Sequence, residues 1–418
     1  MPGHKGTGPL GCETLDITEI RGADDLYHPE GILARSEENA SRLFGCRTVY
    51  SAEGSSLAIR AMLYLAYTRS GCKGRCLAGR NAHKSFLHTA VLLDFPISWL
   101  WAGDSYLSCP VTAETVEAAI LKEKEKPFAV YLTSPDYLGN LAPVGEIASV
   151  CHRYGVPLLV DNAHGAYLHF LEKPLHPLDL GADLCCDSAH KTLPVLTGGA
   201  YLHLSGRVSD ELCGEARQAL ALFGSTSPSY LTLCSLDRCN AYLAGAFRQE
   251  LAEWTALLDE TRQTLRQNGW QAEESDPLRL TLRAPAGQTG TGLARLLRSA
   301  GMECEYADGD HLVLMLTPQN RPEELGRLVE ALGRNDRPPK PPENLPLPKA
   351  RQEMSIREAM LRPQERVPVE KSLGRVCGSP TVACPPAIPI AVSGERIGPE
   401  AVTLLRRCGV ESVEVVKE

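Results

Sequence analysis

The sequence predicts an α/β fold with a mostly parallel sheet, and three observations support this. Short apolar segments alternate with amphipathic helical segments over residues 127–187, a pattern typical of helices that cover a parallel sheet. Polar residues follow the apolar segments at their C-terminal ends, where open α/β sheets bind ligands. The chain has 418 residues, which is too long for one simple core, so further domains are expected.

Composition narrows the class of protein. Hydrophobic residues make up 43% and charged residues 22%, as in ordinary soluble domains. A net charge of −8 without a basic stripe argues against nucleic acid as a partner. No apolar run reaches about eighteen residues, so no membrane span is expected. The 15 cysteines are scattered and include no CxxC pair that could form part of a zinc site, which predicts no metal and a reducing, cytoplasmic location.

The first third of the chain contains a strand, a loop of small residues and a helix in succession. Residues 36–46 have the apolar spacing of a helix that closes on Gly45. Residues 47–56 read as a strand followed by the small-residue loop, and residues 57–71 as a buried helix. This arrangement presents backbone N–H groups to an anion at a helix N-terminus.

The centre of the chain supplies the core strands. We expect strands at residues 127–135 and 156–161 and at residues 182–187, with a helix over 144–155 between the first two. The second strand ends on Asp161, and the third leads directly into "SAHKT".

The pattern of predicted helices and strands changes after residue 235. A long helical stretch over residues 236–268 precedes alternating short strands and helices, which predict a small α+β domain. A proline-rich segment then marks a boundary, and a third module follows it. The predicted parts are a large domain (1–235), a small α+β domain (236–336), a linker (337–349) and a C-terminal α+β domain (350–418).

Asp161, His164 and Lys191 each follow or end a predicted strand, so the sheet brings them to one edge. A lysine can bind an aldehyde covalently, a carboxylate can keep a heterocyclic nitrogen protonated, and a hydroxyl-rich loop before a helix can hold a phosphate. A protein that binds pyridoxal phosphate needs these three groups.

The pattern leaves alternatives open. Charged residues at strand ends are commonly solvated or structural. A nucleotide-binding α/β enzyme is a second alternative, but "GTGPLG" near the start lacks the lysine and hydroxyl of a P-loop, and no GxGxxG opens a helix.

Seven segments in order resemble motifs of the bacterial ornithine/lysine/arginine decarboxylase family: "MPGHKGTGPLG", "DITEIRGADDLYHPEG", "NAHKSFLH", "YLTSPDYLGN", "VDNAHGAYLHF", "DSAHKTLPVLTGGAYLH" and "STSPSYLTLCSLD". The tail, with "CPPAIPI" and "SGERI", resembles the family's C-terminal domain. The resemblance implies a pyridoxal-phosphate-dependent fold of the aspartate-aminotransferase type, with a mixed, mostly parallel seven-stranded sheet. It also implies a homodimer or larger assembly, in a short form without the N-terminal wing domain.

The resemblance also implies roles for individual residues. Lys191 matches the Schiff-base lysine, and Asp161 matches the partner of the pyridine nitrogen. His83 matches the histidine stacked on the cofactor ring, and His164 falls in the segment that lines the other face. Two further residues match positions beside the phosphate and the reactive lysine, namely Ser188 and His190.

The remaining matches concern the phosphate, the neighbouring subunit and the substrate. Within residues 51–56 the phosphate loop departs from the family pattern and its register is open; the candidates are Gly54, Ser55 and Ser56. Thr226 and Ser227 resemble the segment that reaches the neighbouring subunit's phosphate, and Glu395 is the candidate for binding the substrate's cationic end. "CPPAIPI" departs from the family pattern at Cys384 and Ala387.

The implied reaction is α-decarboxylation of lysine, arginine or ornithine to carbon dioxide and a di- or polyamine, the chemistry of a lyase in polyamine biosynthesis. Two alternatives stay open: an aminotransferase or β-eliminating lyase that uses the same lysine and aspartate, and a non-catalytic relative that binds the cofactor.

Overall fold

The computed structural model groups the chain into two compact units. The first comprises residues 1–77, 116–134 and 143–251, and the second comprises 78–115, 135–142 and 252–418. This grouping divides the chain differently from the four-part organisation predicted from the sequence, which stays a prediction. The structure describes residues 1–101, 107–338, 340–341, 347–380 and 388–418.

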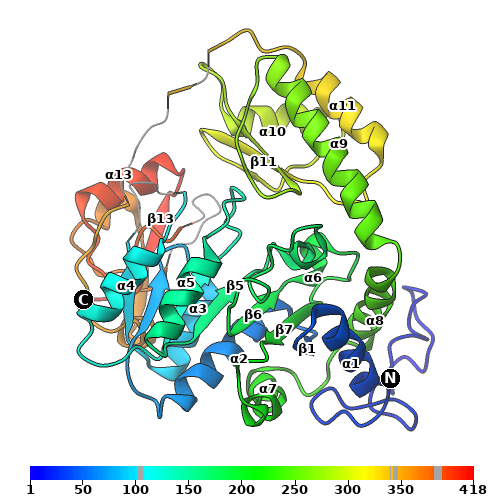
Figure 1. The fold of residues 1–418 in the computed structure, drawn as a ribbon. Helices are drawn as coiled ribbons and strands as arrows, with labels where there is room; N and C mark the ends of the chain where they lie inside the picture. The colour runs from blue at the N-terminus through cyan, green and yellow to red at the C-terminus, as the bar shows by residue number, and fades with distance from the viewer. Residues whose placement is uncertain (102–106, 339, 342–346, 381–387) are drawn as a thin grey trace. The chain divides into compact units, whose positions relative to one another are not determined.

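Helices and strands alternate along most of the chain (Figure 1). The strands are β1 (Arg47–Ser51), β2 (Cys76–Gly79), β3 (Ile97–Leu100), β4 (Ala129–Thr133), β5 (Leu158–Asp161), β6 (Leu184–Asp187), β7 (Ala200–Leu204), β8 (Gln271–Ala272), β9 (Arg279–Arg283), β10 (Tyr306–Ala307), β11 (His311–Met315), β12 (Gln364–Pro368) and β13 (Ser412–Val416). The α-helices are α1 (Ile32–Phe44), α2 (Gly54–Arg69), α3 (Lys84–Leu93), α4 (Ala113–Lys122), α5 (Val144–Arg153), α6 (Ala189–Thr192), α7 (Asp210–Phe223), α8 (Tyr230–Ala244), α9 (Phe247–Gln267), α10 (Gly290–Ser299), α11 (Pro322–Leu332), α12 (Ile356–Leu361) and α13 (Pro399–Arg407). Two 3₁₀ helices are η1 (Ala166–Phe170) and η2 (Val369–Lys371).

A seven-stranded sheet has the order β1-β7-β6-β5-β4-β2-β3. Strands β4, β5 and β6 pair in parallel, whereas β7 pairs antiparallel with both β6 and β1. The mixed, mostly parallel sheet predicted from the sequence is confirmed.

The central strands β5 and β6 end in acidic residues. Every residue of both strands is buried, as expected for strands covered on both faces. Their last residues are Asp161 and Asp187. Both strands therefore deliver a carboxylate to the same edge of the sheet, and Figure 1 shows α6 beyond the end of β6.

Helices α1 and α2 are both present, but each begins earlier than predicted, α1 at Ile32 instead of residue 36. Helix α1 ends where Gly45 adopts a left-handed conformation, with φ of 63°, which glycine adopts without steric cost. Helix α2 is buried along most of its length, but it begins at Gly54, three residues before the predicted start. The small residues Gly54, Ser55 and Ser56 therefore form its first turn rather than a separate loop.

The long helix predicted over residues 236–268 is two helices. Helix α8 ends at Ala244, and Gly245 follows it with φ of −101° and ψ of −112°, outside the helical region. Helix α9 then begins at Phe247. The helical periodicity continues through this segment, so the break depends on the glycine.

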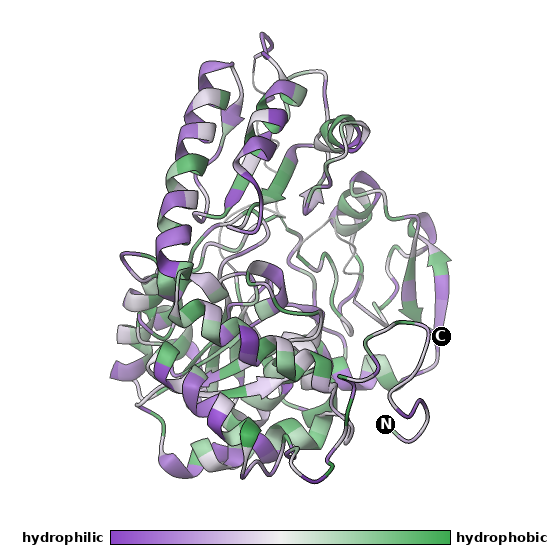
Figure 2. Cartoon of the chain, turned by 90° about the vertical axis from the view of Figure 1, so that its right-hand side faces the viewer, coloured by the Kyte–Doolittle hydropathy of each residue, from purple (hydrophilic) through white to green (hydrophobic). Residues whose placement is uncertain are grey.

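The second unit contains a four-stranded sheet with the order β10-β11-β9-β8 and a two-stranded sheet of β12 and β13. The first has an apolar core of its own, to which helices α10 and α11 contribute Leu293, Leu297 and Leu328. Helices in Figure 2 carry both hydrophilic and hydrophobic residues, as expected when one face of a helix is buried.

The C-terminal part packs its apolar residues around β13, where Val413 and Val415 are buried. Part of the predicted linker and the departures Cys384 and Ala387 lie outside the described residues. Among the helices that the structure describes, none combines the length and apolar character needed to cross a bilayer.

Candidate active site

Lys191 lies in the turn that follows β6. The turn is short: α6 covers Ala189–Thr192, and the Lys191 N–H donates to the Ser188 carbonyl at 3.0 Å. The side chain is partly buried, and its Nζ lies 2.6 Å from Nε2 of His164, which is 5% exposed. The structure thus brings together two of the residues predicted from the strand ends.

Asp161, at the end of β5, is buried and held by donors. The Tyr131 hydroxyl donates to its Oδ2 at 3.1 Å, and the Ala163 N–H donates to its Oδ1 at 3.2 Å. The Cys186 thiol lies 3.7 Å from Oδ1. Burial and the neighbouring Asp161 carboxylate raise the pKa of Tyr131 well above its usual value, so the phenol stays neutral and donates. Tyr131 was not identified from the sequence. A tyrosine in a buried strand could have indicated it, because a buried phenol needs a hydrogen-bond partner.

The N-terminus of α2 lies beside the lysine turn. The Ser188 hydroxyl donates to Ser55 Oγ at 2.8 Å. Gly54 has φ of 73°, and a Cβ built on it would lie 4.0 Å from the His190 ring. The first N–H groups of a helix have no partner within the helix, so this end of α2 has the character of an anion site. The candidates Gly54, Ser55 and Ser56 are the first three residues of α2, and their role in binding the phosphate stays a prediction.

His190 is fixed by backbone rather than by Lys191. Its Nδ1 lies 3.1 Å from the Gly199 carbonyl oxygen, which can only accept, so Nδ1 carries the proton. The ring is partly exposed.

Three further predicted residues make local contacts. Thr226 and Ser227 are exposed in the segment between α7 and α8, where the Ser227 N–H donates to Ser225 Oγ at 3.1 Å. His83, in the second unit, caps α3: its Nδ1 accepts from the Ser85 N–H at 3.2 Å.

Glu395 is part of a buried ion pair in the second unit. Its Oε1 and Oε2 accept from Nη1 and Nη2 of Arg80 at 2.9 and 2.7 Å, and both side chains are at most 2% exposed. The Val392 N–H also donates to Oε2 at 2.8 Å. The Arg80 guanidinium lies 4.8 Å from the Trp99 ring centroid and 5.0 Å from that of Trp101. Both oxygens are engaged in these contacts, and the substrate contact expected of Glu395 from the sequence stays a prediction.

The arrangement in the first unit suits a phosphorylated aldehyde cofactor. It offers an amine that can react, a buried carboxylate one strand away, and a helix N-terminus with two hydroxyl groups. These are the three features required by pyridoxal phosphate, and the geometry fits them.

Comparisons with known proteins identify the family. The model of the family "Orn/Lys/Arg decarboxylase, major domain" matches residues 12–285. "Uncharacterized protein YaaO" of Bacillus subtilis is 31% identical over 94% of this chain and 85% of its own length. An arginine decarboxylase of the same organism is 29% identical over 97% of this chain and 89% of its own length.

Solved structures share the fold. The lysine decarboxylase LdcF of Francisella novicida has a TM-score of 0.81 at 16% identity and covers 100% of this chain, which spans 78% of that protein. The constitutive lysine decarboxylase of Escherichia coli has a TM-score of 0.79 at 18% identity, with coverage of 100% and 79%. The chain therefore belongs to the Orn/Lys/Arg decarboxylase family of enzymes, as the order of its motifs predicted.

Proposed function

We propose that the chain is a pyridoxal-phosphate-dependent α-decarboxylase of a basic amino acid, with arginine as the first substrate to test. The contact that carries the proposal is the 2.6 Å separation between Lys191 Nζ and His164 Nε2, beside the buried carboxylate of Asp161. Arginine is favoured because relatives named arginine decarboxylase cover 94–97% of this chain, whereas a relative named lysine decarboxylase covers 58%.

Each part of the cofactor has candidate partners. Lys191 would hold the aldehyde carbon covalently. Asp161 would accept from the protonated ring nitrogen, while the hydrogen bonds from Tyr131 and Ala163 keep its carboxylate in place. The first turn of α2, with the hydroxyl groups of Ser55 and Ser188, would bind the phosphate. When bound, the cofactor supplies an electron sink for the bond to the departing carboxylate.

The protein's own contribution to the reaction is to move a proton. We infer that Lys191 Nζ would return a proton to the substrate carbon. His164 is placed to hold that proton with Lys191 across their short contact. His190 is a poorer candidate, because its Nδ1 is committed to the Gly199 carbonyl.

His83, Thr226 and Ser227 stay proposals for stacking on the cofactor ring and for reaching a second subunit's phosphate. The exposure of Thr226 and Ser227 in a single chain is compatible with contact to a second copy. A homodimer in the cytoplasm is part of this proposal.

An amine-product assay tests the function. Purified protein with added cofactor is supplied with arginine, lysine or ornithine, and carbon dioxide, amine and keto acid are measured. We expect equimolar carbon dioxide and amine, greatest with arginine, and loss of both in Lys191→Ala. Lys173→Ala, at an exposed lysine of the same unit, is the matched control and should keep full activity. Keto acid without carbon dioxide would indicate an aminotransferase, and full activity in Lys191→Ala would remove the lysine from the mechanism.

A further inference from the structure

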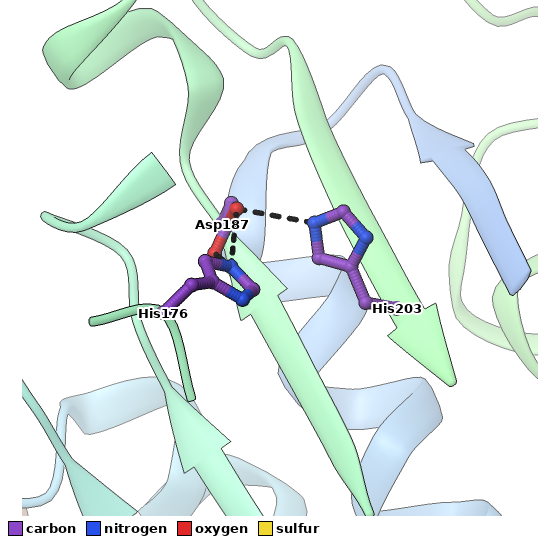
Figure 3. A group of neighbouring side chains, drawn as sticks. All are labelled: His176, Asp187 and His203. Carbon is purple, nitrogen blue, oxygen red and sulfur yellow. Dashed lines mark hydrogen bonds and ion pairs between the residues drawn. The ribbon is translucent and has the colours of Figure 1, made fainter. Parts of the chain in front are cut away.

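A second buried carboxylate, that of Asp187, lies directly before the lysine turn, where donors from four side chains surround it. One of these donors is the Cys185 thiol, which lies 3.7 Å from Oδ1. His176 Nε2 lies 3.2 and 3.1 Å from its two oxygens, and His203 Nε2 lies 3.1 Å from Oδ2. Figure 3 shows the two imidazoles approaching Asp187 from different sides. The Asn162 side-chain amide donates to Oδ1 at 2.6 Å. The side chains of His176, Asp187 and His203 are at most 1% exposed.

Hydrogen bonds on the far side of each ring indicate that both imidazoles donate to Asp187. The Leu178 N–H donates to His176 Nδ1 at 3.4 Å, so the proton of a neutral His176 is on Nε2. His203 Nδ1 lies 2.9 Å from the Thr48 hydroxyl, which can donate to it. Burial lowers the pKa of His203. Burial by itself would raise the pKa of Asp187, but His176 and His203 lower it well below its usual range.

Asp187 is therefore a buried anion surrounded by donors. The same three side chains have the types and spacing of metal ligands, but a metal needs the imidazole nitrogens unprotonated. The contacts around Asp187 favour a hydrogen-bonded anion over a metal site.

Asn162 connects this anion to the end of β5. It follows Asp161 directly, and its N–H donates to the Cys186 carbonyl at 3.0 Å, which extends the pairing of β5 with β6. The chain then folds tightly over the Asn162 side chain: a Cβ at Gly165 would lie 2.0 Å from Asn162 Oδ1. His164 lies within this tight segment, so the position of Asn162 determines where His164 meets Lys191.

The turn with Lys191 starts from the same carboxylate. Asp187 precedes Ser188, whose carbonyl accepts from the Lys191 N–H at 3.0 Å. One buried anion thus lies at the junction of the segment with Asp161 and His164 and the turn with Ser188 and Lys191.

We propose that Asp187 is a positioning residue, whose carboxylate fixes the β5 end and the lysine turn relative to each other through Asn162, His176 and His203. The functional part of this inference rests on the proposed function. Its structural part concerns the protein without cofactor and is tested separately.

The chain offers a matched control at the other end of the same strand. Asp183 is buried just before β6, accepts from the Leu158 N–H at 2.8 Å, and has His152 Nε2 3.1 Å from its Oδ2. It also connects β5 to β6 through a carboxylate and a histidine, but it lies away from the lysine turn. Asp183→Asn therefore reports the general cost of weakening this pair of strands.

Hydrogen exchange on the cofactor-free protein tests the structural part. We expect Asp187→Asn to speed amide exchange at least tenfold in residues 162–165 and 188–192, and Asp183→Asn to leave those segments within about twofold of the wild type. Asn162→Ala breaks only the connection to β5 and should speed exchange in 162–165; it replaces Asp187→Asn if that variant does not fold. Equal exchange in the two aspartate variants would overturn the proposal.

Cofactor binding, followed by its visible absorption, tests the functional part. Asp187→Asn should weaken binding of pyridoxal phosphate roughly tenfold, equivalent to about 1.4 kcal/mol, while Asp183→Asn should change it less than about twofold. If both variants bound pyridoxal phosphate equally weakly, Asp187 would contribute only to stability, and the proposal would be overturned. The proposal would also be overturned if the wild-type protein bound one equivalent of a transition metal and Asp187→Asn did not. If the wild type binds no cofactor but the exchange pattern holds, the proposed function fails and the positioning role of Asp187 stands.

Discussion

At the scale of single residues, Asp161 is the carboxylate that we propose to hold the cofactor's ring nitrogen. Asp161→Asn keeps the shape of the side chain but removes the negative charge that stabilises a protonated ring nitrogen. We expect kcat for decarboxylation to fall by about 10²–10³-fold, the range seen when one stabilising electrostatic contact is removed. Steady-state kinetics with saturating cofactor measure this. Tyr131→Phe removes only the hydroxyl that donates to Asp161. It should lower kcat less than Asp161→Asn does.

The buried pair of Arg80 and Glu395 makes a second prediction. Glu395→Gln leaves the Arg80 charge without its partner, and breaking such a buried pair costs about 3–5 kcal/mol of unfolding free energy. Urea unfolding measures this. Glu353→Gln disrupts an ion pair with Arg396, which is half exposed, and should lower the unfolding free energy far less. An unchanged stability together with a raised KM for the amino acid would contradict this prediction and would favour Glu395 as a substrate contact.

The sequence predicted individual residues where the chain itself places them. Asp161 and Lys191 were identified because a residue at the end of a parallel strand lies at a known edge of the sheet. The partner of Glu395 was not, because Arg80 lies 315 residues away in the chain and no local pattern connects the two. The donors to Asp187 were missed for a similar reason: they come from separate segments that meet only in the folded sheet.

At the scale of elements, β11 of the four-stranded sheet begins with a buried histidine that makes stability depend on pH. Burial alone would lower the pKa of His311, but Asp308 and Glu273, each with an oxygen 3.6 Å from a ring nitrogen, raise it to about 9. The protonated ring therefore stabilises the fold fully below the unfolded pKa of 6.5, and this contribution is lost as pH rises to about 9.

We expect the unfolding free energy to fall by about 3 kcal/mol between pH 6.5 and 9.5, since each unit of pKa difference corresponds to about 1.4 kcal/mol. Urea unfolding at a series of pH values measures the slope. His311→Gln should be less stable at pH 6.5 and show a flatter profile. A profile as steep as that of the wild type would assign the pH dependence to other groups.

Helices were predicted best where the spacing of apolar residues and the residues that end a helix indicate the same boundaries. The spacing in α1 and Gly45 at its end specified that helix, whereas α8 and α9 share a periodicity that conceals the break at Gly245. The start of α2 at Gly54 was also missed, because glycine and serine are typical of loops, and Gly54 itself enters the helix with a left-handed φ of 73°.

At the scale of the whole molecule, the proposed dimer is testable by mixing two inactive variants. Lys191→Ala lacks the reactive amine, and Ser227→Ala lacks a hydroxyl proposed to serve the other subunit. A hybrid dimer has one site with both groups intact. After equal mixing and reassociation, half of the dimers are hybrids, so we expect about a quarter of wild-type activity. Activity no higher than the average of the separate variants would show that Ser227 does not act across an interface.

The central claim is that Lys191 is the covalent anchor of the cofactor, and one measurement tests it most directly. The protein is incubated with pyridoxal phosphate, reduced with borohydride, digested, and its peptides are analysed by mass spectrometry. We predict one modified lysine per chain, at Lys191, with modification lost when arginine is added before reduction. Stoichiometric labelling of another lysine, or no labelling of Lys191, would contradict the account.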